Sequence, residues 1–512
     1  MRLVTLVFLF ACNGADPADT DTDTDTDTDS DSGSDTDTGT DTDTDTDTGT
    51  GTGTGTDVAC TSIVTGAVTV TNATELAALT GVCEITGNLV VQNSDLVDLT
   101  GLESLRTIGG ALVVSQNASL TNIDALSGLN SVTNWITISK NPQQTSIDGL
   151  VGIETAYDLV LEELPIADVD ALSGLQTVER ELRIDNLANL TNIEGLASVT
   201  SVGRLSIKDC PSLLDIEGLR SLTNVTDYLL LYQDRAVTTL EGLRNLETVA
   251  GGFYMESMHV TSFTGLESLT RVGGTLSLKS ISYVTDISAL SNLTYVGEGV
   301  LLTSMSNLAN VDGLSGLTTV TGDLTLSGIG GGGPVDLGGL SGLTSVGGNA
   351  VLGPLGRAPN LDGLAALATV GGNLSISTND RMTSVALPSL TAVGGDFAIE
   401  KLGNYTTQTG HALTSLAGLE SLTTVGGTLR VSQNNNLTNL DGLSGVNAVG
   451  SVNVSTNALL TSIAGLNGIS AVNDFTVSDN AALCEQLVTT ALSAITVSGA
   501  TTTTGNLDCI GR

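Results

Sequence analysis

Cysteine carries the most readily assigned chemistry in this chain, and four of its six cysteines form two close pairs. Cys60 and Cys83 lie close together in the sequence, and so do Cys484 and Cys509. A disulfide within either pair would close a loop of about 25 residues, which stabilises a fold by about 3 kcal/mol in the chain-entropy model. We therefore expect two local disulfides, Cys60–Cys83 and Cys484–Cys509, one near each end of the folded part.

Cys210 stands apart from these pairs, three residues after Ile207. A thiolate here could act as a nucleophile or a metal ligand. However, the same position in related segments is an asparagine, and leucine-rich repeats place Asn or Cys at one buried position. We expect Cys210 to be a buried structural residue and not a nucleophile. The equivalent asparagines are Asn117, Asn141, Asn379, Asn434, Asn457 and Asn480.

Cys12 follows a short apolar segment at the start of the chain, which ends Leu9-Phe10-Ala11-Cys12. A basic start and an apolar run too short to span a bilayer are typical of a secretory signal, here residues 1–11. Leu-x-Ala-Cys resembles the lipobox of bacterial lipoproteins, and the resemblance implies a lipid on Cys12. A simple secreted protein is the alternative, and residues 508–512 do not form the hydrophobic tail of a glycolipid anchor.

Acidic residues dominate the charge, which is formally −39, and residues 16–57 contain 15 Asp and no Lys or Arg. Residues 16–57 are nearly all Asp, Thr and Gly and offer almost no apolar side chains to bury, so we expect residues 12–57 to form a disordered tether. Specific calcium binding is disfavoured because an EF-hand glycine and closing glutamate are missing. The charge also disfavours nucleic acid and anionic lipid as partners, since both need clustered cations.

The rest of the chain must be organised by a repeat of about 24 residues, and repeats of this length are typical of solenoids. The clearest copy runs from Gly418 to Asn434, with the pattern G-L-x-x-L-x-x-V-G-G-x-L-x-V-x-x-N. The step from Leu387 to Leu419 is longer than the others, and it predicts a looped insertion because extra residues in a repeat map to loops. The repeat leucines are Leu102, Leu126, Leu150, Leu172, Leu196, Leu219, Leu243, Leu266, Leu290, Leu314, Leu340, Leu364, Leu387, Leu419, Leu443 and Leu466.

Each copy contains one segment that alternates apolar and polar residues, as in residues 427–432, where Leu429 and Val431 alternate with polar residues. This predicts a short strand with Leu429 and Val431 inward, stacked in parallel on the next copy. The Gly-Gly pair before many strands predicts a tight corner. The fold class is therefore mainly β: a right-handed parallel β-helix or leucine-rich solenoid of about 17 turns, closed by disulfide-stapled caps.

The first turns combine two cysteines with three apolar-patterned segments: Cys60, residues 75–79, Cys83, residues 85–91 and residues 99–105. In these residues the chain resembles the receptor L-domain family, and the resemblance covers roughly residues 58 to 511. The resemblance implies a solenoid of the kind found in ligand-binding receptor ectodomains. The cysteine-rich module of those receptors is missing, so signalling is not implied, and no family motif marks a ligand-binding residue.

Catalysis by a β-helical carbohydrate enzyme would need clustered acids and bases on neighbouring strands. His259 has no evident partner, and His411 lies in the long insertion. We expect no enzyme, no cofactor and no metal. The central outward residues of successive strands contain no carboxylate: Val90, Val113, Thr137, Val160, Arg183, Ser206, Leu230, Tyr254, Ser277, Leu301, Thr325, Val351, Ser375, Ala398, Arg430, Asn453 and Thr476.

Aromatic residues gather in one stretch, with seven of the twelve outside the signal lying between residues 228 and 295. Tyr and Arg are enriched in binding hot spots, and local drift within a repeat array is the alternative explanation. The strand pattern predicts a ligand-binding surface formed by Tyr228, Leu230, Tyr232, Tyr254, Arg183 and Lys208.

These observations predict a monomeric, lipid-anchored protein of the cell envelope, at the outer membrane or cell surface, or otherwise secreted. Its solenoid would bind an extracellular protein or glycan, and its only contact with a membrane would be the lipid. The alternatives are a structural envelope protein without a specific ligand and, less favoured, a β-helical carbohydrate-active enzyme.

Overall fold

The structure, a computed structural model, describes residues 62–331, 333–402 and 413–509. The chain divides into two units, Met1–Thr56 and Asp57–Arg512, and every described residue belongs to the second. The expected signal peptide 1–11, the tether 12–57, Cys12, Cys60 and His411 lie outside the described residues.

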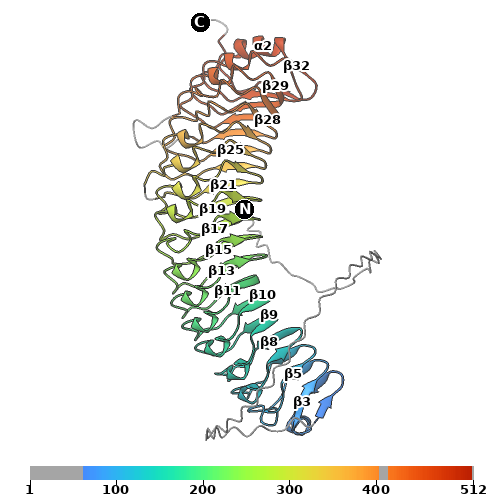
Figure 1. Cartoon of the computed structure of the whole chain (residues 1–512). Helices are drawn as coiled ribbons and strands as arrows, with labels where there is room; N and C mark the ends of the chain where they lie inside the picture. The colour runs from blue at the N-terminus through green and yellow to red at the C-terminus, as the bar shows by residue number, and fades with distance from the viewer. Residues whose placement is uncertain (1–61, 332, 403–412, 510–512) are drawn as a thin grey trace, which may run out of the picture. The chain divides into compact units, whose positions relative to one another are not determined.

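The main sheet contains one strand from each turn, and every neighbouring pair is parallel (Figure 1). All 17 strands predicted from the sequence are present, from β4 to β31, and β2 and β33 add one at each end. In order the strands are β2 Val68–Val70, β4 Leu89–Gln92, β6 Leu112–Ser115, β8 Trp135–Ser139, β9 Thr155–Glu162, β10 Thr177–Asp185, β11 Ser201–Lys208, β13 Leu229–Tyr232, β15 Phe253–Glu256, β17 Leu276–Lys279, β19 Val300–Thr303, β21 Leu324–Ser327, β23 Ala350–Leu352, β25 Leu374–Ser377, β27 Phe397–Glu400, β28 Thr424–Ser432, β29 Ala448–Ser455, β31 Phe475–Ser478 and β33 Thr501–Thr502.

Short strands precede the main-sheet strands and also pair in parallel from turn to turn. They are β1 Ser62–Val64, β3 Val82–Ile85, β5 Thr107–Ile108, β7 Ser131–Val132, β12 Asn224–Val225, β14 Thr248–Val249, β16 Arg271–Val272, β18 Tyr295–Val296, β20 Thr319–Val320, β22 Ser345–Val346, β24 Thr369–Val370, β26 Ala392–Val393, β30 Ala471–Val472 and β32 Thr496–Val497.

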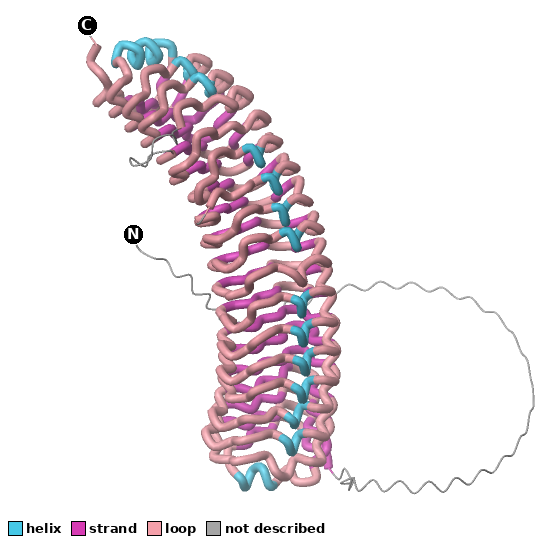
Figure 2. Tube along the Cα trace, turned by 90° about the vertical axis from the view of Figure 1, so that its left-hand side faces the viewer, coloured by secondary structure: helices cyan, strands magenta, loops and turns pink. Residues whose placement is uncertain are grey.

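Single turns of 3-10 helix, which hold many of the repeat leucines, stack along another side of the body (Figure 2). Their leucines point into the core, as Leu126 and Leu150 do, because both are fully buried. The turns are η1 Asp124–Leu126, η2 Asp148–Leu150, η3 Asp170–Leu172, η4 Glu194–Leu196, η5 Glu217–Leu219, η6 Glu241–Leu243, η7 Ser288–Leu290, η8 Asp312–Leu314, η9 Gly338–Leu340, η10 Asp362–Leu364, η11 Asp441–Leu443 and η12 Ala464–Leu466.

The hydrophobic core is one continuous column of Leu, Val and Ile, as the repeat predicts. Leu429 and Val431 of β28 are fully buried, and Arg430 between them is exposed. A Cβ added to Gly426 would collide with the carbonyl oxygen of Gly394 in the preceding turn, so the Gly-Gly corner is required by close backbone approach.

The residue directly after most main-sheet strands has a left-handed backbone although it is not glycine. Gln116, Lys140, Gln233 and Thr456, for example, have φ of 59°, 56°, 59° and 59°. Such a conformation is uncommon for a residue with a side chain and persists only where the surroundings fix it. Every turn of this kind therefore changes direction at one defined corner. The next residue is the position of the buried Asn of the repeat, or of Cys210 in its turn, and we call this the ladder position.

Two short helices close the ends of the described body. Helix α1 (Ala73–Ala77) is capped by Asn72, whose side chain accepts hydrogen bonds from the backbone of Thr74 and Glu75. Helix α2 (Glu485–Ala494) lies over the last turns and buries Val488.

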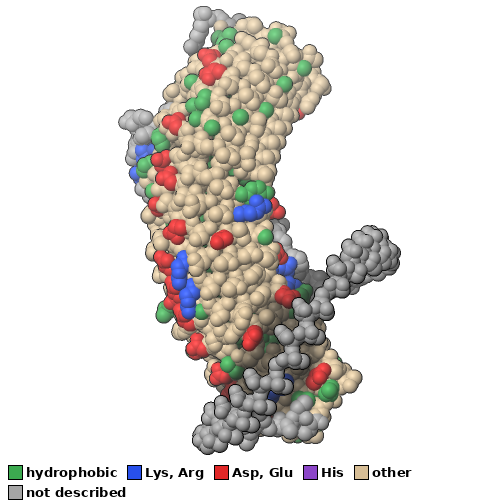
Figure 3. All heavy atoms as spheres, in the orientation of Figure 1, with side chains coloured by type: hydrophobic (Ala, Val, Ile, Leu, Met, Phe, Trp, Pro, Cys, Tyr) green, Lys and Arg blue, Asp and Glu red, His purple; other side chains and the backbone are tan. Residues whose placement is uncertain are grey.

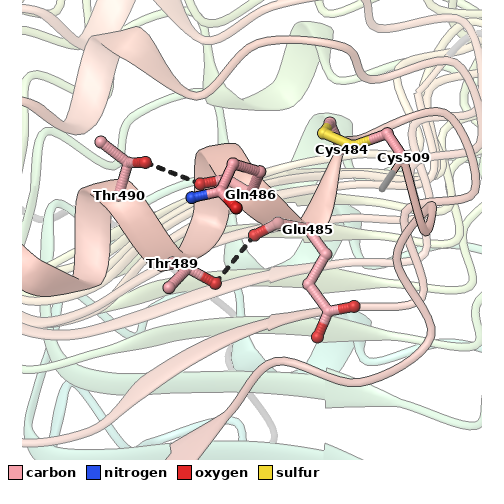
Figure 4. The surroundings of a disulfide bond; sticks show 6 residues. All are labelled: Cys484, Glu485, Gln486, Thr489, Thr490 and Cys509. Carbon is pink, nitrogen blue, oxygen red and sulfur yellow. Dashed lines mark hydrogen bonds between the residues drawn. A yellow bond between two sulfur atoms is a disulfide. The ribbon is translucent and has the colours of Figure 1, made fainter. Parts of the chain in front are cut away.

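A disulfide joins Cys484, directly before α2, to Cys509, with their Cα atoms 5.6 Å apart (Figure 4). Cys83 at the other end is disulfide-bonded as well, and its expected partner Cys60 lies outside the described residues. Both ends of the solenoid thus contain a covalent cross-link, which limits fraying of the terminal turns. Within the described ranges, no helix has the length and apolar character needed to cross a membrane.

Candidate functional site

The six residues predicted to bind a ligand lie on four neighbouring strands, β10, β11, β13 and β15, or directly beside them. The register aligns Arg183 with Ser206, then Leu230, then Tyr254, and it aligns Lys208 with Tyr232. The inward neighbours Leu229, Leu231, Phe253 and Met255 are fully buried. We call the surface formed by these six residues the tyrosine face: Arg183, Lys208, Tyr228, Leu230, Tyr232 and Tyr254.

The tyrosines of this face are held against the sheet and still reach solvent. Tyr228 and Tyr232 are half-buried, and Tyr254 is 37% exposed. A Cβ on Gly252 would collide with the Tyr254 ring, so the ring lies flat over that glycine. Burial raises the pKa of both the Tyr228 and Tyr254 hydroxyls, which keeps them protonated and able to donate hydrogen bonds.

The cations of the tyrosine face are already paired with carboxylates. Arg183 lies 2.6 Å from Asp185, and Lys208 lies 2.8 Å from the same carboxylate. Arg204, 2.6 Å from Asp227, stacks over Tyr228 with its guanidinium 5.6 Å from the ring centre. Because these charges are neutralised locally, the face does not present a strong electrostatic field to a ligand. The sequence pattern predicted the cations but not their partners.

Carboxylates are present on the sheet surface, in the outward rows on either side of the central row predicted to lack them. Asp158 pairs with Arg180, and Glu162 and Asp185 lie at the ends of β9 and β10. Each of these three acids contacts a cation. In the described parts of the chain, no group of three or more His, Cys, Asp or Glu side chains is placed to hold a metal ion.

A shallow groove of about 340 Å³ is lined by residues of the corners that follow β13, β15 and β17. His259, which had no evident partner in the sequence, packs edge-on against Tyr283 with ring centres 4.9 Å apart. Tyr283 is 54% exposed, and Arg235 lines the same groove. Arg235, His259 and Tyr283 follow one another at intervals of one repeat, so the repeat spacing could have identified them. The groove is lined by Arg235, Ser257, His259, Ser280, Ser282 and Tyr283.

Cys210 lies in the core next to this region and is fully buried. Burial raises the pKa of its thiol to about 12, so the reactive thiolate is not formed at neutral pH. The structure thus places Cys210 at the buried position predicted from the repeat, behind the tyrosine face and not on it.

On the side of the body shown in Figure 3, charged and hydrophobic side chains occupy a small part of the surface. In this view acidic side chains are scattered mainly along one margin, and apolar side chains are few and dispersed. A concentration of tyrosine is therefore unusual for this surface, which Ser, Thr, Asn and Gly dominate.

Comparison with known proteins assigns the first turns of the body. Residues 59–150 match the family model of the receptor L domain. The resemblance to receptor L domains is thereby confirmed for this segment, which extends from β1 to η2 and contains Cys60 and Cys83. No curated protein has significant sequence similarity to the chain.

Several solved structures are similar in fold. An internalin from Listeria monocytogenes is 17% identical with a TM-score of 0.36, over 64% of this chain and 83% of the internalin. A complex of TLR13 with ssRNA13 is 14% identical with a TM-score of 0.36, over 85% of this chain and 76% of that one. A leucine-rich-repeat protein of Leptospira interrogans is 11% identical with a TM-score of 0.30, over 84% of this chain and 99% of that one. These values do not support any transfer of function.

Proposed function

We propose that this chain is an extracellular recognition protein that binds a protein or glycan through the tyrosine face. The observation that carries the proposal is the clustering of Tyr228, Tyr232 and Tyr254 with Leu230 on adjacent strands of an otherwise Ser- and Thr-rich surface. Tyrosine offers a large contact area at a low cost in conformational entropy, and its ring face also stacks on sugars.

The groove beside the tyrosine face extends the proposed binding region. It begins directly after the last residues of β15 and β17, since Ser257 follows Glu256 and Ser280 follows Lys279. Tyr283 adds a further exposed ring, and the Ser hydroxyls add donors and acceptors suited to sugar hydroxyls or peptide groups. The receptor L-domain match at residues 59–150 supports an extracellular binding role, because that family forms ligand-binding ectodomain modules.

The binding surface is tested with a triple variant, Tyr228→Ala/Tyr232→Ala/Tyr254→Ala, on arrays of envelope glycans and purified surface proteins. We expect the wild-type chain to bind one class and the triple variant to lose at least about tenfold in affinity, as for hot-spot tyrosines. The matched control is Tyr157→Ala/Tyr295→Ala, which removes two exposed tyrosines outside the face. Equal binding by wild type and triple variant would reject the tyrosine face, and no binding by any form would favour a structural envelope protein.

We further propose that the body is anchored by a lipid on Cys12 and held away from the membrane by residues 13–57. The anchor is supported by the sequence Leu9-Phe10-Ala11-Cys12 alone. Metabolic labelling with a fatty acid in a bacterial host should label the wild-type chain and not Cys12→Ser. An unlabelled wild-type chain would contradict the anchor and leave simple secretion.

A further inference from the structure

Buried asparagines connect successive turns in a ladder along the corners that follow the main-sheet strands. The side-chain oxygen of Asn480 accepts the backbone N–H of Asn457 at 3.0 Å. Its amide nitrogen donates to two backbone carbonyls, those of Val454 and Ser478, both at 3.0 Å. Asn457 repeats the arrangement, accepting from Asn434 at 3.0 Å and donating to the Val431 and Ser455 carbonyls at 2.9 and 3.2 Å. An asparagine at the ladder position therefore offers an accepting oxygen to one backbone N–H and a donating NH2 group to two backbone carbonyls.

Asp234 occupies this same position, three residues after Leu231 of β13. It is fully buried, and its Oδ1 accepts the backbone N–H of Cys210 at 2.7 Å, as the oxygen of a ladder asparagine does. Its second oxygen, Oδ2, is buried and has no hydrogen-bond partner, the one such side-chain atom in the described part of the chain. In the ladder asparagines the amide nitrogen donates to one carbonyl of the preceding turn and to the carbonyl two residues before itself. The equivalent carbonyls for Asp234 are those of Ile207 and Tyr232.

An ionised carboxylate cannot donate, and its charge would be unfavourable next to two carbonyl oxygens in the core. A protonated carboxyl keeps the accepting oxygen and supplies one O–H donor in place of the two N–H donors of the asparagine amide. We propose that Asp234 is a protonated member of the ladder, which holds the corner after β13 through its acidic proton and loosens that corner when the proton leaves. The inference concerns the fold beneath the tyrosine face and does not depend on the proposed function.

The surroundings of Asp234 favour the protonated form. Burial, with smaller contributions from the negative charges of Asp209 and Asp185, raises the pKa of Asp234 to about 7, and this outweighs the lowering by the backbone hydrogen bonds of Cys210 and Tyr232. Cys210, its nearest titratable neighbour, stays neutral. In the next turn the ladder position is Met258, which carries no charge. Other charged or titratable residues near it in the sequence and the strand register are Lys208 in the preceding turn, Tyr232 and Arg235 in its own turn, and Glu256 and His259 in the next turn.

The carboxyl proton of Asp234 lies close to the tyrosine face, because one of its two expected acceptor carbonyls belongs to Tyr232. That carbonyl already accepts the N–H of Asp209 at 3.0 Å, so it belongs to the hydrogen-bonded path between turns. Loss of the proton would place a charge against this carbonyl and weaken the bonds that fix the end of β13. The position of Tyr232 is thereby linked to the charge of a residue two positions away.

The free thiol of Cys210 provides a local reporter, since Cys210 donates its own N–H to Asp234 and is buried. In the full chain, labelling of Cys210 by dithiodipyridine, read by mass spectrometry of its peptide, measures how often this corner opens. Dividing the wild-type rate by that of Asp234→Asn cancels the pH dependence of the reagent. We expect the ratio to rise by up to about tenfold per pH unit from about pH 5 to 7 and then level off. A ratio that does not change over this range would overturn the proposal.

Two further measurements keep the test independent of folding effects. Asp209→Asn removes a neighbouring charge but keeps the carboxyl of Asp234. Its Cys210 labelling rate, divided by that of Asp234→Asn, should rise with pH as the wild-type ratio does. The rise should be shifted to slightly lower pH, because the removed charge helps to raise the pKa of Asp234. The infrared difference spectrum between wild type and Asp234→Asn at about pH 5 should show the carbonyl band of a protonated carboxylic acid. Absence of that band in a folded wild-type chain would also overturn the proposal.

Discussion

The C-terminal turns and the central turns fix the same corner with different chemistry. From Asn434 to Asn480 the ladder position is a fully hydrogen-bonded asparagine in every turn. In the centre it is mostly apolar, as at Leu187 and Met258, both fully buried. The sheet surface differs as well, since tyrosines and ion pairs are concentrated over the central turns.

The difference shows that side chains of different chemistry can pack at this corner, provided that they fill the buried space. Leu, Met, Cys and Asn all follow the same left-handed residue without a break in the strand register. Asp234 is the exception, because it fills the space with a group whose fit depends on pH. The corner after β13 can therefore respond to pH, whereas the ladder asparagines of the C-terminal turns do not titrate.

The largest effect on stability is expected for Asn457→Asp, which places a carboxyl like that of Asp234 at the ladder position of a C-terminal turn. As at Asp234, burial should raise the folded-state pKa of the new carboxyl above the ordinary 3.8. The folded state then holds a proton that the unfolded state has lost, so stability is full below about pH 4 and falls as the pH rises toward the folded-state pKa. Each pKa unit of that rise corresponds to a loss of about 1.4 kcal/mol. Urea unfolding across this range measures it, with the exposed Asn447→Asp as control, and a pH-independent difference would contradict it.

The second-largest effect on stability is expected at the C-terminal cap, which contains the disulfide Cys484–Cys509. The double variant Cys484→Ser/Cys509→Ser removes the cross-link between the segment that follows β31 and the chain end. We expect a loss of about 3 kcal/mol for that cap in the chain-entropy model. Hydrogen exchange should become faster in α2 and β33 and stay unchanged in β10 to β15. Uniformly faster exchange would show that the cap stabilises the whole stack cooperatively.

A smaller effect is expected for Asn434→Ala, which removes one ladder member where two turns join across the long insertion. Asn434 accepts the N–H of Leu402 at 3.0 Å and donates to the Ile399 carbonyl at 2.8 Å, so both partners would be left unsatisfied. We expect a loss of about 2 kcal/mol in the free energy of unfolding. The urea midpoint measures it against Asn447→Ala, an exposed asparagine in the same part of the chain. Equal midpoints would mean that water replaces the lost bonds.

The smallest effect on stability is expected for the tyrosine face. Its tyrosines are only half-buried and their inward neighbours fill the core, so Tyr232→Ala should change stability by about 1 kcal/mol or less. Thermal unfolding at one fixed pH measures this, with Leu231→Ala as the buried contrast at about 2–5 kcal/mol. A large loss for Tyr232→Ala would mean that the face serves the fold and not a ligand.

The strand positions, the inward residues and the buried asparagine position could all be predicted, because the same pattern recurs in many copies of the repeat. The period-two alternation of residues 427–432 is enough to place Leu429 and Val431 inward, and neighbouring copies agree. The left-handed corners could not be predicted, since residues as different as Gln116, Lys140 and Thr456 occupy them and none signals a positive φ. Their conformation follows from the turns above and below, which a single copy does not reveal.

The positions of the candidate residues on the sheet could be predicted from the sequence, but the ion pairs of their cations could not. The alternation in β13 indicated that Tyr228, Leu230 and Tyr232 face outward together. The pairing of Arg183 and Lys208 with Asp185 depends on which strands become neighbours, a property of the stack and not of any one strand. Asp234 could have been found from the sequence, because it stands at an asparagine position of the repeat and differs from asparagine in a single group.

The long step between Leu387 and Leu419 has a consequence for how this molecule can change in length. Strand β28 pairs with β27 in the usual register, from Phe397 opposite Leu429 to Glu400 opposite Ser432, despite the longer stretch of chain between them. The register of the two strands is thus unaffected by the extra residues between them. Gain or loss of one whole repeat should accordingly lengthen or shorten the body by about 4.8 Å and keep both neighbours intact. A gene that encodes such a chain can adjust the reach of a binding surface in small, equal increments.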